Sequence, residues 1–172
     1  DPGTICCGYG VVEVDGSHLT ANRSRSRGKT EPSYVTAGDI RLNRKAPLPE
    51  RLKSLYSALK KTIDAYGPAH LCMEKIFYHK SIRSAMTLGS TRGVAMLLAA
   101  QYGLPVYEYN PTELKMAITG YGRAEKQQVR EMVMRILHLD PSELSLSEDS
   151  SDALALCICH VHSYASLEAR GA

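Results

Sequence analysis

The segment formed by residues 147–162 constrains the fold most. It is apolar over residues 153–159, and a helix that is apolar on all sides is buried. Asp149 and Asp152 stand at its start, and residues three apart lie on one helix face. Ionised groups beside apolar packing are costly unless a cation or hydrogen-bond donors compensate, which suits a metal site. Taken alone, the pair is more simply explained by Asp149 as an N-cap and Asp152 as a first-turn acid.

Two other acids occupy equally unusual positions. Glu74 interrupts the apolar run 71–77, whose length and lack of polar alternation predict a buried strand. Asp1 begins an Asp-Pro-Gly-Thr turn ahead of a strand-like segment. If these acids converge with Asp149 and Asp152, two charges about 4 Å apart repel by roughly 4 kcal/mol at an effective dielectric of about 20. Magnesium takes oxygen ligands, and paired ions serve many nucleases and polymerases. The acids therefore predict phosphodiester chemistry.

Composition limits the class of protein. A chain of 172 residues with 44% hydrophobic content predicts a single domain over 1–172. A net charge of +3 permits a nucleic-acid partner without requiring one. The five cysteines are odd in number and mostly in apolar surroundings, which favours reduced thiols over a zinc site at 157–162. No signal peptide opens the chain and no run approaches the roughly 18 apolar residues of a membrane span, so we expect a soluble, cytoplasmic protein.

Patterning along the chain predicts an α/β order. We expect strands at 8–14, 34–42, 71–77 and 105–109, and helices at 49–66, 84–102, 111–116, 127–139 and from 147 onward. The basic stretch 22–33 is expected to be a loop, either simply solvated or in contact with phosphate. This order is typical of a mixed sheet covered by helices. Such a sheet can bring Asp1 and Glu74 together at adjacent strand ends, with the last helix packed over them.

Four motifs occur in order along nearly the whole chain: Asp1-Pro2-Gly3 with Gly8-Tyr9-Gly10-Val11, Glu74 three residues before Phe77, Ala124-Glu125-Lys126, and Asp149-x-x-Asp152-Ala153-Leu154-Ala155. Together they resemble the RuvC family of Holliday junction resolvases. The resemblance implies a ribonuclease H-like fold with a five-stranded mixed sheet flanked by helices on both faces. It also implies a bacterial homodimer that nicks four-way DNA junctions symmetrically during recombination and repair. The implied cofactor is Mg²⁺, two ions per subunit, and the implied partner is a branch-migration complex.

The resemblance also implies roles for individual residues. Asp1, Glu74, Asp149 and Asp152 match the family's catalytic, metal-binding carboxylates. Phe77 matches an aromatic residue that stacks on a junction base, and Lys115 and Lys126 match lysines that face the DNA backbone. Without the family, Phe77 reads equally well as a core ring and the lysines as ordinary exposed side chains.

Some questions stay open at this point. Another ribonuclease H-like nuclease acting on RNA or a hybrid, or a non-catalytic junction-binding protein, fits the acids as well. An actin-like kinase fragment also uses an Asp-x-Gly-Thr turn, but the chain is too short for that two-domain fold. Because no strand precedes Asp1, we expect a processed chain or a fragment. The helix at 84–102, with Gly89 and Gly93 on it, is a candidate dimer contact.

Overall fold

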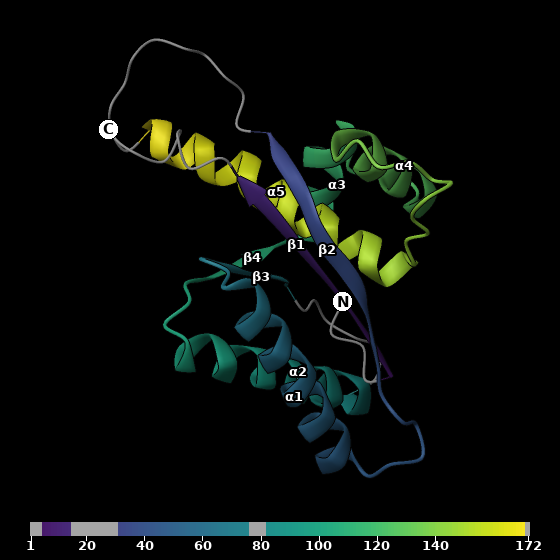
Figure 1. Cartoon of the computed structure of the whole chain (residues 1–172), viewed down its shortest axis with the longest axis vertical. Coiled ribbons are helices and arrows are strands. Elements are labelled where there is room, and N and C mark those ends of the chain that lie inside the picture. The colour runs from purple at the N-terminus through teal and green to yellow at the C-terminus, as the bar shows by residue number, and fades with distance from the viewer. Residues whose placement is uncertain (1–4, 15–30, 76–81, 171–172) are drawn as a thin grey trace.

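Figure 1 shows the computed structural model of the chain, which describes residues 5–14, 31–75 and 82–170. The elements in order are β1 (Cys6–Val14), β2 (Pro32–Arg41), α1 (Leu48–Tyr66), β3 (Leu71–Glu74), α2 (Ile82–Gln101), β4 (Val106–Tyr109), α3 (Pro111–Thr119), α4 (Lys126–Ile136) and α5 (Glu148–Arg170). Every helix and strand predicted from the patterning is present, with ends shifted by a few residues. Within the described ranges, no helix is both long and apolar enough to cross a membrane.

The strands form two pairs. β1 and β2 are antiparallel neighbours with an irregularity between Val11 and Val12, and their valines and tyrosines suit a pleated, half-buried surface. β3 and β4 are parallel, with Glu74 beside Tyr109. The described residues thus contain four strands in two two-stranded sheets, and the fifth strand of the expected sheet stays a prediction.

Helix α5 is the centre of the molecule. It contacts both strand pairs as well as α3 and α4, and Figure 1 shows it running alongside β1 and β2. Leu154, Ala155 and Ile158 are fully buried, so the prediction of a buried helix is confirmed. These side chains pack with Val129 and Val133 of α4 in the main hydrophobic core, which explains why α5 is apolar on nearly all sides.

Helices lie on both faces of the β3–β4 pair. On one face, the Tyr109 hydroxyl is 2.7 Å from Nδ1 of His160 on α5. On the other, Arg92 of α2 forms an ion pair with Glu108 of β4. Glu74 stands level with Tyr109 in the parallel register, and neighbouring residues at one register position of a sheet point to the same face. Glu74 therefore faces α5, the helix that carries the other two described acids.

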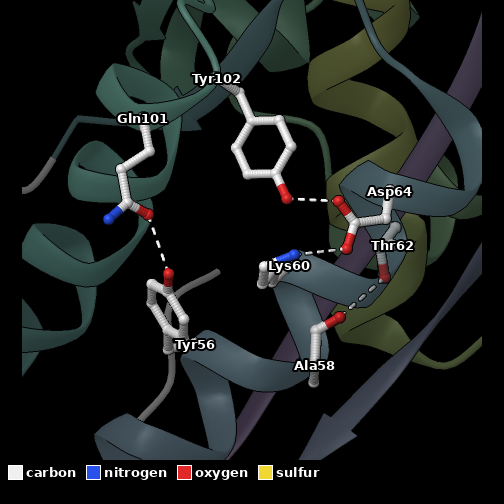
Figure 2. A network of polar contacts seen from close by, with 7 residues as sticks. All are labelled: Tyr56, Ala58, Lys60, Thr62, Asp64, Gln101 and Tyr102. Atoms are coloured by element: carbon white, nitrogen blue, oxygen red, sulfur yellow. Dashed lines mark hydrogen bonds and ion pairs between the residues drawn. The ribbon is translucent and has the colours of Figure 1, made fainter.

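Polar contacts join α1 to the end of α2 (Figure 2). The Tyr56 hydroxyl donates to Oε1 of Gln101 at 2.9 Å, and the Tyr102 hydroxyl donates to Asp64. Asp64 also pairs with Lys60 one turn earlier, at 2.7 Å. Most of these side chains are exposed, so each contact stabilises the fold only slightly. They connect α1 to the C-terminal end of α2.

Candidate active site

The carboxylate of Glu74 lies at the carboxyl end of β3 and is half-buried. Burial raises its pKa, the Asp152 carboxylate raises it further, and the Lys126 ammonium opposes the shift. A raised carboxyl pKa means that the ionised form is disfavoured where it stands. The end of β3 is therefore a place where negative charge is crowded and where a cation would be stabilised.

Ser147, and not Asp149, caps the start of α5. The Ser147 hydroxyl accepts a hydrogen bond from the Ser150 N–H at 3.0 Å, and the Ser151 N–H bonds to the Ser147 carbonyl at 3.0 Å. The helix accordingly begins at Glu148. The interpretation of Asp149 as an N-cap is wrong, because the cap lies two residues earlier. The Asp149 carboxylate is left available for another partner.

Lys126 lies at the first position of α4 and faces the start of α5. Its Nζ is 3.4 Å from Oδ2 of Asp152 and 3.4 Å from Oε2 of Glu148. The Asp152 carboxylate is the main reason that the pKa of Lys126 is raised. The structure thus places this predicted DNA-binding lysine beside a predicted catalytic acid. Lys115 lies on α3, half-buried, and among the described residues no ion pair joins it to the acids.

A third group of side chains was not predicted from the sequence. The Sγ of Cys6 and carboxylate oxygens of Asp39 and Asp149 all lie within 4.8 Å of one another. Burial, together with the Asp149 and Asp39 carboxylates, raises the pKa of the Cys6 thiol to about 11. A thiol with so high a pKa stays protonated and unreactive at neutral pH. Asp39 reaches this position through its place in the β1–β2 register, for which the sequence carries no local signal.

Two glycines let α5 approach β1 closely. A Cβ added to Gly8 would lie 2.1 Å from the carbonyl oxygen of Asp149, and one added to Gly10 would lie 2.8 Å from Cδ2 of Leu154. No other residue type permits such an approach. The Gly8-Tyr9-Gly10 motif therefore sets the position of the first turns of α5, including Asp149.

The structure describes three of the four predicted acids and does not gather them into one cluster. Glu74 and Asp152 interact electrostatically. Within the described ranges, however, the only trio of possible ligand atoms that falls within 4.8 Å is the Cys6 group, which contains Asp149. Asp1 and Phe77 lie outside the described residues. Convergence of the four carboxylates on one metal centre stays a prediction.

The chain is similar to known proteins over most of its length. The family model for Crossover junction endodeoxyribonuclease RuvC matches residues 1–160. The chain belongs to the RuvC family. The RuvC of Pelotomaculum thermopropionicum is 43% identical over 164 residues, covering 95% of this chain and 91% of that protein. The RuvC of Syntrophotalea carbinolica is 43% identical over 164 residues, covering 95% and 92%.

Solved RuvC structures share the fold. A Thermus thermophilus RuvC structure superposes with a TM-score of 0.79 at 27% identity, covering 98% of this chain and 93% of that one. T. thermophilus RuvC in complex with Holliday junction substrate superposes with a TM-score of 0.82 at 26% identity, covering 96% and 92%. The predicted family and the ribonuclease H-like α/β class are confirmed. Every predicted site residue lies within the stretch that matches the RuvC family model.

Proposed function

We propose that this chain is a Holliday junction resolvase, an endonuclease that makes paired, symmetric nicks in four-way DNA junctions during recombination and repair. Membership of the RuvC family supports the reaction. The observation that carries the proposal is that Glu74, Asp152 and Lys126, from three different elements, interact with one another at the end of β3. A carboxylate pair with an adjacent ammonium suits the hydrolysis of a charged phosphodiester.

Asp1, Glu74, Asp149 and Asp152 are assigned as the ligands of Mg²⁺, two ions per subunit. The donor set fits, because carboxylate oxygens suit a hard divalent cation. The raised pKa of Glu74, due first to burial and then to Asp152, marks a carboxylate pair that a cation would stabilise. Bound Mg²⁺ supplies activation of water and charge neutralisation at the phosphate. The Cys6 thiol is a soft donor and is not part of this set.

The chain's other residues position the DNA. Lys126 holds the Asp152 carboxylate at 3.4 Å and is free to transfer that contact to a phosphate when the junction binds. Lys115 is assigned to the DNA backbone and Phe77 to stacking on a junction base. A branch-migration complex as partner and action in the bacterial cytoplasm belong to the same proposal.

A cleavage assay tests this function. A labelled four-way junction and a linear duplex of the same sequence are incubated with the protein, with and without Mg²⁺. We expect symmetric nicks on the junction alone, dependent on Mg²⁺. Asp152→Asn should retain junction binding and lose cleavage, whereas Asp140→Asn, at an exposed acid in the loop before α5, should cut normally. Binding without nicks by the unmodified protein, or normal cutting by Asp152→Asn, would refute the proposed chemistry.

The homodimer is proposed to form through α2. Ile82, Met86 and Leu97 are 79%, 71% and 54% exposed, and with Gly89 and Gly93 they follow one helix face. A Cβ at either glycine would meet nothing within 4 Å, which leaves room for a second helix. Exposed apolar stripes of this kind mark interaction surfaces, and a two-fold pair of subunits matches the symmetry of a junction.

A charged side chain introduced on this face of α2 tests whether the dimer forms there. Met86→Glu should convert the protein to a monomer in sedimentation experiments and abolish paired nicking. Met116→Glu on α3 is the matched control, because Met116 is 53% exposed and lies on another helix. A monomeric unmodified protein, or a Met86→Glu variant that remains dimeric, would contradict this surface.

A further inference from the structure

Ser147 connects the start of α5 to strand β2. Its hydroxyl donates to Oδ1 of Asp39 at 2.6 Å and accepts the Ser150 N–H at 3.0 Å. A hydroxyl has one proton to donate, so the bond to Asp39 fixes the direction in which the Ser147 lone pairs point. The short distance is that of a charge-assisted hydrogen bond to a carboxylate. Asp39 thus orients the side chain that caps α5.

Asp39 lies at the level of the sheet where β1 comes close to α5. It is the register partner of Gly8 on β1, and Gly8 is where the Asp149 carbonyl comes within 2.1 Å of an added Cβ. The first turn of α5 is therefore held at two adjacent points, by backbone contact with β1 and by a hydrogen bond to β2. Because there are two contacts, the end of the helix cannot rotate about either of them alone.

We propose that Asp39, acting through Ser147, is a positioning residue for the cleavage reaction, which fixes the first turn of α5 and so places the Asp149 and Asp152 carboxylates. This rests on the proposed assignment of those two acids as metal ligands. The Asp39 oxygen that accepts the Ser147 proton is already engaged. This hydrogen bond connects Asp39 to the cap of α5 and, through the cap, to the turn that carries Asp149.

Matched pairs of variants separate this role from direct metal binding. Asp39→Asn keeps an acceptor for the Ser147 hydroxyl, whereas Asp39→Ala removes it. Ser147→Thr keeps the hydroxyl, whereas Ser147→Ala removes it. Asp140→Ala is the control, because Asp140 also accepts a serine hydroxyl, from Ser142 at 2.7 Å, but in the loop before α5. The readouts are the single-turnover cleavage rate, the Mg²⁺ concentration giving half-maximal rate, and junction binding in EDTA.

Small displacements of reacting groups have large effects on rate, so Asp39→Ala and Ser147→Ala should each slow cleavage by about 10-fold. Both should raise the half-maximal Mg²⁺ concentration and leave junction binding in EDTA unchanged. Asp39→Asn and Ser147→Thr should recover most of the rate. The double alanine variant should be no slower than the slower single variant, because both remove one interaction.

Several results would overturn the proposal. If Asp39→Asn cuts as slowly as Asp39→Ala, Asp39 acts as a metal ligand and not through the cap. Normal cleavage by Asp39→Ala, or additive losses of rate in the double variant, would show that Asp39 does not act through Ser147. If Asp39→Ala fails to fold, the comparison of Ser147→Ala with Ser147→Thr decides alone. Asp152→Asn distinguishes failure of the metal-ligand assignment from failure of the positioning role. If Asp152→Asn cuts normally, the metal-ligand assignment is wrong. If Asp152→Asn is inactive while Asp39→Ala and Ser147→Ala cut normally, only the positioning role of Asp39 and Ser147 is refuted.

Discussion

Gly8→Ala should damage the active site without changing any carboxylate. The added Cβ would lie 2.1 Å from the carbonyl oxygen of Asp149, 2.2 Å from its carbonyl carbon and 2.8 Å from the Ser150 nitrogen. All three are backbone atoms, so no side-chain rotation relieves the overlap. The start of α5 has to move away from β1.

The size of the effect follows from these distances. Real Cβ contacts essentially never fall below 3.0 Å, so the first turn of α5 must withdraw by about 1 Å. Overpacking of this kind costs about 1–3 kcal/mol of stability, and a displacement of about 1 Å in a catalytic group can cost roughly 10²-fold in rate. Because Asp149 is at the contact and Asp152 is one turn later, both carboxylates move with the helix.

Gly38→Ala is the control in the same sheet. A Cβ there would meet the Tyr9 ring at 3.0 Å, and a ring can shift where a backbone cannot. Cleavage rates on a labelled junction and urea unfolding should show a large loss for Gly8→Ala and a small one for Gly38→Ala. A Gly8→Ala protein as stable and as fast as the parent would refute the close contact between β1 and α5.

Three further predictions concern charge. Because burial raises the pKa of Glu74 from 4.5, its ionisation lowers stability as pH rises, and Glu74→Gln should melt at higher temperature in EDTA at neutral pH while losing cleavage. Burial, with His70 beside it, lowers the pKa of His160 to about 4. As pH falls, this histidine is protonated in the unfolded chain before it is protonated in the folded protein. The free energy of unfolding therefore decreases between pH about 6.5 and pH about 4, by up to ~3 kcal/mol. In His160→Gln the free energy of unfolding should change less over that range. Lys126→Met removes an exposed cation near Asp152 and should tighten Mg²⁺ binding, measured by calorimetry, by no more than about 5-fold while weakening junction binding.

The sequence predicts those helices and strands that are marked by the spacing of apolar residues within a short segment. The apolar residues around Leu154 and Ile158 require a buried helix, and the inward positions Val129 and Val133 of α4 follow from 3.6-residue spacing; all four are buried in the structure. The family resemblance, which rests on ordered motifs, is confirmed by the match over residues 1–160.

The site is predictable only in part, because long-range register decides the rest. Serine and aspartate are about equally good N-caps, so the sequence does not distinguish Ser147 from Asp149 as the cap of α5. The arrival of Asp39 beside Asp149 depends on which residue of β2 pairs with Gly8. A shift of one residue would turn Asp39 to the other face of the strand. The interaction between Lys126 and Asp152 likewise depends on how α4 packs on α5.

Anomalous diffraction from crystals soaked in Mn²⁺, an oxygen-preferring substitute for Mg²⁺, shows whether acids from β3 and α5 form one metal centre. We expect an anomalous peak within ligand distance of Glu74 and Asp152, which disappears in crystals of Asp152→Asn. A peak held only by Cys6, Asp39 and Asp149, or no peak near Glu74 at Mn²⁺ concentrations that support cleavage, would contradict a metal centre shared by β3 and α5.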